Sequence, residues 1–379
     1  MVNPSPGFWA GRRVLLTGHT GFKGSWLLLW LLELGAEVWG YALEPEPDPN
    51  LFRQLRPMLK GRNFQHRIGD LADAAGLEQV VADCQPEVVL HLAAQPLVRR
   101  SYEDPLGTWA TNVMGSLQLL EALRPLRQPC AVVMVTTDKV YENREWLHGY
   151  RETDPLGGHD PYSASKAGAE LAIASWRASF CGPAAHQTPH LAIATARAGN
   201  VIGGGDWALD RIVPDAMRAL AAGRPIAVRN PAATRPWQHV LEPLGGYLDL
   251  AKALATDPQP PCEAFNFGPS LESNRPVRDL VASILEHWKG SWLDQSDAQS
   301  PHEASLLHLQ IDKAHHRLGW SPRWDYTTTV AHTVGWYRAQ DQGASALSCC
   351  LDDLNRYQQS MKQGAILPQV KGKNCVGFS

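Results

Sequence analysis

The stretch DPYSASKAGAE carries a tyrosine and a lysine four residues apart, Tyr162 and Lys166. On a helix this spacing puts both side chains on one face. A phenol with an ordinary pKa near ~10 is a poor base at neutral pH, but a neighbouring ammonium favours the phenolate and lowers that pKa. A tyrosine supported in this way can take the proton of a substrate hydroxyl. The same spacing is also common in amphipathic surface pairs, so its meaning depends on the surrounding motifs.

A second reactive group follows the apolar run VMV, where the chain reads Thr136, Thr137, Asp138 and Lys139. A carboxylate and an ammonium at the mouth of a buried strand are costly to desolvate unless something holds or uses them. A surface turn is the alternative interpretation. Because the step precedes the segment with the Tyr–Lys pair, we interpret it as part of a reaction centre.

The first glycine-rich loop, LLTGHTGFKGSW, spaces Gly18, Gly21 and Gly24 three apart between an expected strand and an expected helix. Glycine permits a tight turn and a close approach of the backbone to a pyrophosphate, and the helix N-terminus attracts the anion. The position of the loop on the first strand-to-helix turn therefore predicts a dinucleotide site. His19 and Lys23 lie inside the loop and are candidates for adding charge near phosphate or ribose, with solvent-facing roles as the alternative.

The signals for the adenosine half of a cofactor are incomplete. An acidic residue about twenty positions beyond the loop usually marks NAD preference, but that region reads WGYA over residues 39–42. The residues alone therefore leave NAD and NADP both open. Asp70, at the end of a later strand, suits an adenine amino group and equally suits a helix N-cap. The small residues of HLAAQP, 91–96, would let a cofactor lie across the strand ends.

A scaffold that gathers strand ends would bring these groups together, and the chain predicts one. Short β-rich runs alternate with longer helical stretches, which is typical of βαβ units in a parallel, doubly wound α/β sheet. We expect a Rossmann-type domain over 1–203, with a strand near 263–268 returning to its sheet. The looser pattern that follows predicts a smaller C-terminal α/β substrate-binding lobe over 204–345. The weakly patterned segment 346–379 is interpreted as a C-terminal tail.

Bulk composition excludes several classes of function. A net charge of −3 over 379 residues argues against nucleic acid as a partner. The seven cysteines form no CxxC pair, which favours reduced thiols in a cytoplasm over a disulfide framework. The most apolar segment, WLLLWLLEL at 26–34, is too short to span a bilayer and predicts a buried helix instead. No HExxH or Cys/His ligand spacing indicates a metal site.

Together these motifs resemble a known family. TGxxGFxG, the Asp–Leu step, HLAAQ, TNVxG, TTDK and YSASK are similar to the extended short-chain dehydrogenases and reductases. Longer stretches, among them DKVYENREWLHGYRETDPLGGHDPYS and RAGNVIGGGDWALDRIVPD, resemble the branch of that family that dehydrates CDP-linked glucose, over roughly residues 7–340. The resemblance implies tightly held NAD. The cofactor-binding residues it implies are Gly18, His19, Gly21, Phe22, Lys23, Gly24, Asp70, Leu71, Ala93, Ala94, Gln95, Asn112, Thr136, Tyr162 and Lys166.

The resemblance also implies the reaction. CDP-D-glucose would lose water to give a 4-keto-6-deoxy sugar, a precursor of deoxysugars in bacterial O-antigens. Thr137 would orient the C4 oxygen towards Tyr162, which Lys166 supports, and Asp138 would protonate the departing C6 hydroxyl. Related dTDP-glucose dehydratases carry Asp–Glu where this chain has Asp138–Lys139. Lys139 cannot be a base while it is protonated, so either its pKa is depressed or it holds the substrate or a water.

Substrate contacts and assembly follow from the same resemblance. Asn200 follows the last Rossmann strand, where relatives contact the substrate phosphate, and Arg211 and Arg235 occupy basic positions that meet the pyrophosphate. Arginine suits such bidentate contacts, although an ordinary surface ion pair is the alternative for each. Relatives pair through the Tyr–Lys helix and the segment TWATNVMGSLQLLEALRPL, which implies a homodimer or homotetramer. No membrane partner is expected.

Two other functions remain open. A 4-epimerase or another nucleotide-sugar dehydratase of the family would keep Tyr162 and Lys166. An epimerase expels no water, however, and needs no acid at Asp138. A non-catalytic dinucleotide-binding regulator typically lacks the tyrosine or the lysine, and both are present. The residues therefore favour dehydration of a nucleotide sugar.

Overall fold

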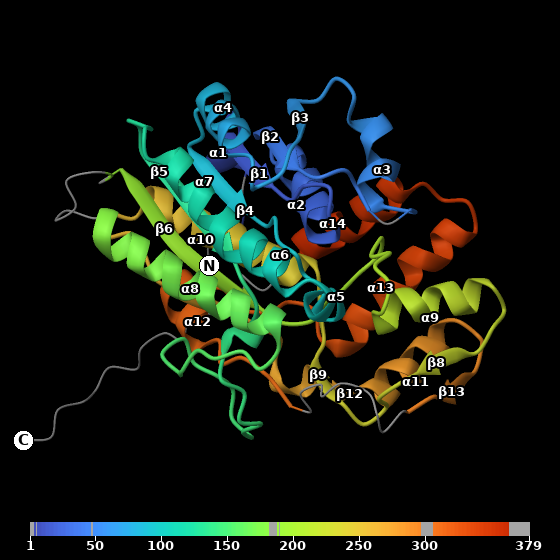
Figure 1. The fold of residues 1–379 in the computed structure, drawn as a ribbon. Helices are drawn as coiled ribbons and strands as arrows, with labels where there is room; N and C mark the ends of the chain where they lie inside the picture. The colour runs from blue at the N-terminus through green and yellow to red at the C-terminus, as the bar shows by residue number, and fades with distance from the viewer. Residues whose placement is uncertain are drawn as a thin grey trace, which may run out of the picture.

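The structure, a computed structural model, describes residues 4, 6–46, 48–181, 188, 190–296 and 306–363. Its centre is a seven-stranded sheet with the order β11-β6-β5-β4-β1-β2-β3, in which all neighbours are parallel (Figure 1). The strand order reverses between β1 and β4, so the sheet is doubly wound, as predicted. The strands are β1 (Arg13–Thr17), β2 (Glu37–Ala42), β3 (Phe64–Ile68), β4 (Val88–His91), β5 (Cys130–Val135), β6 (Leu191–Ala198) and β11 (Ala264–Phe267).

Helices cover both faces of the sheet, because successive side chains along a strand point to opposite faces. On β1, Val14 and Leu16 join one hydrophobic core and Leu15 joins the other. The first core is shared by α2 (Phe22–Glu33), α10 (Leu241–Thr256) and α14 (Ala346–Gln363). The second is shared by α4 (Ala74–Cys84), α7 (Gly115–Leu123) and α8 (Pro161–Phe180), which lie along the opposite face in Figure 1.

The segment predicted as a buried helix is α2. All residues from Trp26 to Leu32 are buried, so this helix is apolar on every side and is enclosed by the sheet, α10 and α14. Gly35, with a φ of 83°, takes the left-handed conformation in the turn that follows. Within the ranges that the structure describes, no helix has the length and apolar character needed to cross a membrane.

Short helices connect the strand ends. They are α1 (Pro6–Trp9), α3 (Leu51–Leu55), α5 (Val98–Glu103) and α6 (Pro105–Trp109), with 3-10 turns at η1 (Arg56–Leu59), η3 (Asp138–Val140) and η4 (Leu271–Ser273). The long helix predicted over TWATNVMGSLQLLEALRPL runs from α6 through a π-helical turn, η2 (Ala110–Met114), into α7. Such π turns often mark functional positions in helices.

Most of segment 204–345 forms a smaller lobe beside the strand ends (Figure 1). Its paired strands are β8 with β13 and β9 with β12, and its β10 pairs with β7, which lies just before the segment. Three elements of the segment lie elsewhere: α10 packs against β4, β5 and β6, β11 pairs with β6, and α12 (Asp312–Leu318) packs against β11 and α10. The expected returning strand is therefore present, but assigning all of 204–345 to the smaller lobe is wrong. The remaining bounds are β7 (Val201–Ile202), β8 (Ile226–Val228), β9 (Thr234–Pro236), β10 (Gln238–His239), β12 (Asn274–Pro276), β13 (Trp292–Asp294), α9 (Ile212–Ala221), α11 (Val277–His287) and α13 (Tyr326–Asp341).

The predicted tail at 346–379 is wrong for its first half. Residues Ala346–Gln363 form α14, which lies beside α2 in Figure 1. Cys350, Leu354, Tyr357 and Met361 of this helix are buried in the large core. Their spacing of three to four residues is helical, but the polar residues between them obscured the pattern. Residues 364–379 lie outside the described part of the chain.

Candidate active site

The predicted site residues gather at the carboxyl ends of β1, β4 and β5, where the strand order reverses and α/β sheets bind their ligands. Gly18 has a φ of 75°, and a Cβ on it would lie 2.6 Å from the backbone nitrogen of Ala93. A Cβ on Gly24 would collide with the carbonyl oxygen of Gly18. Packing of the loop on β4, and of α2 on the loop, therefore requires these two glycines. Gly21 is exposed at the start of α2, which no side chain caps, so this end of the helix fits a pyrophosphate.

His19 is buried behind the loop and adds no charge to it. Its Nε2 lies 2.7 Å from Nδ1 of His66, and its ring packs edge-on against Phe52 and Phe64. Burial, followed by the charge of His66, lowers the pKa of His19 to about 3. The imidazole is therefore neutral at physiological pH and fully buried, so neither of the two roles considered for it, added charge and a solvent-facing position, applies. A Cβ on Gly40 of β2 would lie 2.6 Å from the His19 ring, which explains why a glycine faces it.

Lys23 lies within electrostatic reach of the predicted reaction centre. Burial lowers its pKa to about 8, with Arg211 and Lys166 acting in the same direction and Asp138 opposing them. The same interaction acts on Asp138, whose carboxylate form Lys23 favours. The glycine loop thus places the Lys23 ammonium close to Asp138 and Lys166, two of the residues predicted for catalysis.

The residues expected on the adenosine side lie after β3. Asp70 is exposed, and its Oδ1 accepts a hydrogen bond from the backbone nitrogen of Ala72 at 2.9 Å. The N-cap of α4 is Asp73, so the helix-cap alternative for Asp70 is wrong. Leu71 is buried, and a Cβ on Gly115 would lie 2.8 Å from its side chain. The Asp70 side chain is therefore accessible to a cofactor at the end of β3, whereas the Leu71 side chain packs in the interior.

Gln95 and Asn112 hold the loop after β4. Asn112 accepts from the backbone nitrogen of Gln95 at 2.9 Å, and its Nδ2 donates to the Gln95 carbonyl at 3.1 Å and to Ser165 Oγ at 2.9 Å. The Gln95 side chain donates to Thr108 Oγ1 at 2.9 Å. These bonds tie the loop to α6 and α8 and fix the backbone of Ala93 and Ala94. The predicted role of Asn112 at the cofactor is thus supported only indirectly, through the loop.

Asp138 is turned inward at the end of β5. The Thr137 hydroxyl accepts from the backbone nitrogen of Lys139 at 3.4 Å and donates to Asp138 Oδ1 at 2.9 Å, which starts the 3-10 turn η3. Asp138 is 2% exposed, and a Cβ on Gly199 would lie 2.6 Å from its Oδ2. The Thr136 hydroxyl points elsewhere and donates to Glu170 at 2.6 Å. The TTDK step is therefore not a surface turn.

The protonation of Asp138 is set by opposing effects. Burial raises the pKa of its carboxyl, while the charge of Lys139, the bond from Thr137 and the charges of Lys23 and Arg235 act against burial. Burial favours the neutral carboxyl, while the nearby cations stabilise the carboxylate. Such a carboxyl can release a proton and regain it. Lys139 itself is half-buried beside it.

Tyr162 and Lys166 are both buried in the first turns of α8. Asp160 caps this helix by accepting from the backbone nitrogen of Ser163 at 3.0 Å, and Ser101 of α5 accepts from the backbone nitrogen of Tyr162 at 3.1 Å. These contacts fix the helix start against the loop after β4. The four-residue spacing therefore places both side chains at the carboxyl end of β5.

The pKa values of this pair differ from the expectation. Burial raises the pKa of Tyr162 to about 12, although a hydrogen bond with Thr137 and the charge of Arg211 oppose it. Burial lowers the pKa of Lys166 to about 8, and Glu170 opposes that shift. The prediction that Lys166 lowers the tyrosine pKa is therefore wrong for the protein's own groups, because desolvation outweighs the nearby cations. A positively charged nicotinamide ring bound near Tyr162 would act against burial, because its charge would favour the phenolate.

The sequence analysis missed a buried ion pair beneath the site. Glu170 accepts from Arg197 Nη2 at 2.8 Å, from Thr195 Oγ1 at 2.8 Å and from Thr136 Oγ1 at 2.6 Å. Both charged side chains are less than 5% exposed. The pair joins α8 to β5 and β6 and so fixes the helix that carries Lys166. Glu170 lies four residues after Lys166, and this continued spacing was the available signal.

The predicted substrate residues lie on the side facing the smaller lobe. Asn200 follows Gly199, directly after β6. Arg235 is on β9, and its charge acts on Asp138. Arg211 stands at the N-cap of α9, where its Nη1 donates to Asp206 Oδ2 at 2.9 Å. The charge of Asp206 is the main cause that raises the pKa of Arg211.

The assembled groups can perform two linked reactions on one substrate. Tyr162 can take a proton from an alcohol beside the glycine cradle, and Asp138 can protonate a departing oxygen nearby. Arg211 and Arg235 suit a diphosphate. In the described residues, no group of three or more His, Cys, Asp or Glu side chains is placed to hold a metal ion.

The fold and this site define a class, the dinucleotide-binding enzymes with a Tyr–Lys pair on the helix after β5. Residues 15–254 match the family described as GDP-mannose 4,6 dehydratase. The chain belongs to this family, within the extended short-chain dehydrogenases and reductases. It is 46% identical over 355 residues to the CDP-glucose 4,6-dehydratase of Salmonella typhimurium, covering 93% of this chain and 98% of that protein. It is 31% identical over 339 residues to the dTDP-glucose 4,6-dehydratase of Streptomyces antibioticus, covering 86% and 92%.

Solved structures show the same architecture. The dTDP-glucose 4,6-dehydratase of Streptomyces venezuelae, solved with NAD bound, superposes with a TM-score of 0.73 at 25% identity, covering 87% of this chain and 98% of that one. The UDP-glucuronic acid 4-epimerase of Bacillus cereus gives a TM-score of 0.73 at 22% identity, covering 86% and 99%. Dehydratases and epimerases thus share the fold, and the site residues must distinguish between them.

Proposed function

We propose that this protein converts CDP-D-glucose to CDP-4-dehydro-6-deoxy-D-glucose and water, with NAD as its cofactor. The observation that carries the proposal is the position of Thr137, whose hydroxyl donates to Asp138 Oδ1 at 2.9 Å and which also lowers the pKa of Tyr162 against the effect of burial. Tyr162, the base for alcohol oxidation, and Asp138, the acid for water loss, therefore lie close enough to act on the same sugar. The 46% identity to the Salmonella typhimurium CDP-glucose 4,6-dehydratase supports the cytidine nucleotide.

The order of steps follows from the chemistry of the sugar. The C6 hydroxyl is a poor leaving group and the C5 hydrogen is not acidic until C4 is a ketone. Tyr162 takes the proton of the C4 hydroxyl, with Lys166 beside it. Bound NAD would supply the hydride acceptor for C4 and, once reduced, the hydride donor for C6. Between these events the C5 proton, acidic beside the C4 ketone, is lost to a base while Asp138 gives its proton to the C6 oxygen; the C6–O bond breaks, water leaves and a C5–C6 double bond forms. C5 regains a proton when the hydride is added to C6.

Lys139 contributes to the elimination step through its charge. It stands next to Asp138, and its ammonium is the largest influence that opposes the burial of that carboxyl. An acid that has released its proton must carry a negative charge until it is reprotonated, and a fixed cation stabilises that state. This role distinguishes the Asp–Lys step of this chain from the Asp–Glu step of the related dTDP-glucose dehydratases.

The residues present fit NAD. Gly18, Gly21 and Gly24 shape the loop at the uncapped start of α2, and Ala93 and Ala94 leave the end of β4 open for the cofactor. NAD rather than NADP is supported by the dTDP-glucose 4,6-dehydratase of Streptomyces venezuelae, which was solved with NAD. Phe22 and Asp70 are proposed to contact the cofactor from the surrounding elements, and Thr136, whose hydroxyl donates to Glu170, is proposed to do so through its backbone alone.

The test is a comparison of nucleotide sugars. Purified protein with NAD is incubated with CDP-glucose and, separately, with the dTDP-, UDP- and GDP-linked glucoses, and product masses are measured. Loss of one water from CDP-glucose is expected. Isomerisation without a change of mass would identify a 4-epimerase, and NAD binding without turnover of any sugar would identify a regulator. Dehydration of another nucleotide sugar in preference to CDP-glucose would contradict the assigned base.

We also propose a homodimer or homotetramer located in the cytoplasm. Adjacent helices α6, η2 and α8 expose large apolar side chains: Leu106 is 82%, Met114 53% and Leu171 62% exposed. Exposed large apolar side chains on adjacent helices are typical of association surfaces. Free cysteines in the described part of the chain fit a reducing compartment. Sedimentation that shows a monomer at micromolar concentration would contradict the oligomer.

A further inference from the structure

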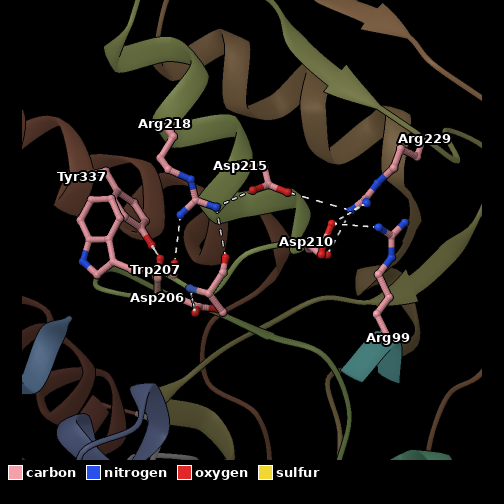
Figure 2. A network of polar contacts seen from close by, with 9 residues as sticks. Arg99, Asp206, Trp207, Asp210, Asp215, Arg218, Arg229 and Tyr337 are labelled. Carbon is pink, nitrogen blue, oxygen red and sulfur yellow. Dashed lines mark hydrogen bonds and ion pairs between the residues drawn. The ribbon is translucent and has the colours of Figure 1, made fainter. Parts of the chain in front are cut away.

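The loop that carries Arg211 is held in place by a residue that the proposed mechanism does not use, Asp210. Asp210 has a φ of 63°, in the left-handed region that side chains rarely adopt, although Asp enters it more readily than most. In Figure 2, dashed lines join its carboxylate to the guanidinium groups of both Arg99 and Arg229. A strained residue directly before a substrate-facing arginine calls for a physical reason.

Three hydrogen bonds fix Asp210. Arg229 donates from Nη1 to Asp210 Oδ1 at 2.7 Å and from Nη2 to the Asp210 backbone carbonyl at 3.2 Å. Arg99 donates from Nη1 to the same Oδ1 at 3.2 Å. Arg99 is on α5, beside the loop after β4, whereas Arg229 follows β8 of the smaller lobe. The Asp210 carboxylate therefore joins the two lobes. The bond from Arg229 to the Asp210 backbone carbonyl also holds the left-handed backbone directly.

The upstream part of the loop is anchored separately. The carbonyl of Asp206 accepts from the Tyr337 hydroxyl at 2.5 Å, and the carbonyl of Gly204 accepts from Trp26 Nε1 at 2.9 Å. Asp206 is 3% exposed, and its carboxylate holds the Arg211 guanidinium at 2.9 Å. Arg211 is therefore held at its guanidinium by a buried acid and at its backbone by the bridge through Asp210.

We propose that Asp210 is a positioning residue for substrate binding, acting through Arg211. The bridge Arg99–Asp210–Arg229 keeps residue 210 left-handed, and the next residue then presents its guanidinium to the Tyr162 side of the site. The inference rests on the proposed function, because it gives Arg211 the diphosphate of a nucleotide sugar to bind. Loss of the bridge lets the loop relax and weakens diphosphate binding, while the groups that move protons stay in place.

A surface ion pair without such a role is the alternative. The side chains of Arg99, Asp210 and Arg229 are 52%, 48% and 40% exposed, and pairs of this kind often contribute little to stability. The two possibilities differ in what a variant changes. A positioning role alters nucleotide binding with little change in folding, whereas an idle surface pair alters neither.

Three variants of Asp210 and one control separate these possibilities. Asp210→Ala removes the bridge and leaves a residue poorly suited to a left-handed φ. Asp210→Gly removes the bridge and frees the backbone, and Asp210→Asn keeps an oxygen that can accept from Arg229. The control is Asp352→Asn, an exposed carboxylate paired with Arg356 at 2.9 Å on α14.

The expected pattern is a split between KM and kcat. We expect KM for CDP-glucose, and the Kd for CDP measured by calorimetry, to rise about tenfold in Asp210→Ala and Asp210→Gly and less than about threefold in Asp210→Asn. We expect kcat to stay within about twofold, because no proton-transfer group is touched. The control should match the wild type in both quantities.

A double variant shows whether the effect passes through Arg211. Arg211→Lys weakens CDP binding by itself, since lysine lacks the planar bidentate fork. If Asp210 acts through Arg211, adding Asp210→Ala to Arg211→Lys changes the Kd little further. Independent action would multiply the two factors. The positioning role would be overturned if the Kd of the double variant rose by the product of the two single-variant factors. It would also be overturned if Asp210→Ala bound CDP as tightly as the wild type.

The wild type distinguishes the two proposals. Wild-type protein that binds CDP more tightly than Asp210→Ala but does not dehydrate CDP-glucose would overturn the proposed function alone. Dehydration by the wild type together with an unaffected Asp210→Ala variant would overturn the positioning role alone. Wild-type protein that binds no nucleoside diphosphate would overturn both.

Discussion

The carboxyl end of β5 and the loop that enters α9 bring charges to the same site, but they hold them by different means. At β5, Asp138, Lys166 and the Glu170–Arg197 pair are almost excluded from water. In the loop, Asp210 and its two arginine partners are each about half exposed. A buried charge that loses its partner is strongly destabilising, whereas water and salt screen an exposed one.

This difference matches the two tasks. Proton transfer needs a shifted pKa, and burial is what raises the pKa of Asp138 and lowers that of Lys166. Binding a diphosphate needs cations that stay charged and reachable. We therefore expect changes near β5 to act steeply on chemistry or folding, and changes in the loop to act mildly on binding.

Asp138→Asn should have the largest effect. An amide cannot give the proton that the C6 oxygen needs, so water loss should slow by about 10²–10⁴-fold. Oxidation at C4 does not use this proton, so reduced NAD should accumulate transiently, visible by stopped-flow absorbance. In the wild type the raised pKa predicts that activity falls as pH rises through it, because the acid must be protonated. Normal dehydration by the variant would show that Asp138 is not the acid.

Glu170→Ala tests the buried side of the comparison through stability. The change leaves Arg197 with a charge in a site that is 4% exposed, so the free energy of unfolding should fall by about 3–5 kcal/mol. Asp352→Asn, in an exposed pair on α14, should lose less than about 1 kcal/mol. Urea unfolding measures both. Similar losses in the two variants would mean that burial does not separate these ion pairs.

Local patterns were sufficient for the parts of the site that are set by neighbours in sequence. Alternating strands and helices predicted the doubly wound sheet, and the glycine spacing predicted the tight turn between β1 and α2, where Gly18 has a φ of 75°. The four-residue spacing of Tyr162 and Lys166 placed both on one buried face. Each of these depends on the local periodicity of a helix, strand or turn.

The errors arose where distant segments meet. His19 is neutral because it packs with Phe52, Phe64 and His66, which are more than thirty positions away in the sequence. The high pKa of Tyr162 depends on how deeply several elements bury it, and spacing carries no measure of depth. Helix α14 was taken for a tail because polar residues separate its buried side chains.

Glu242 extends the comparison to a buried charge far from the chemistry. It is 0% exposed and accepts from the Trp324 backbone at 2.7 Å and from the Tyr357 hydroxyl at 2.8 Å. Burial raises its pKa to about 7 from 4.5. The folded state therefore binds the proton more tightly, so this contribution to stability is complete below pH 4.5 and is lost as pH rises through about 7.

Glu242→Gln should remove that pH dependence. Between pH 5 and 8 the unfolding free energy of the wild type should fall by roughly 3 kcal/mol more than that of the variant. Histidines titrate in the same window in both proteins, so the difference between the two profiles is the quantity to compare. Parallel profiles would show that Glu242 keeps an ordinary pKa and that burial acts only near the active site.

The smallest effects are expected from the two arginines that hold Asp210, and their order is informative. Arg229 makes two bonds, one of them to the backbone carbonyl, whereas Arg99 makes one bond at 3.2 Å. Arg229→Ala should therefore raise KM for CDP-glucose up to about fivefold and Arg99→Ala about twofold, with stability changed by less than about 1 kcal/mol. A larger effect from Arg99→Ala would mean that Arg211 is positioned by the Arg99–Asp210 bond between the lobes. The bond from Arg229 to the Asp210 backbone carbonyl would then not be the main cause.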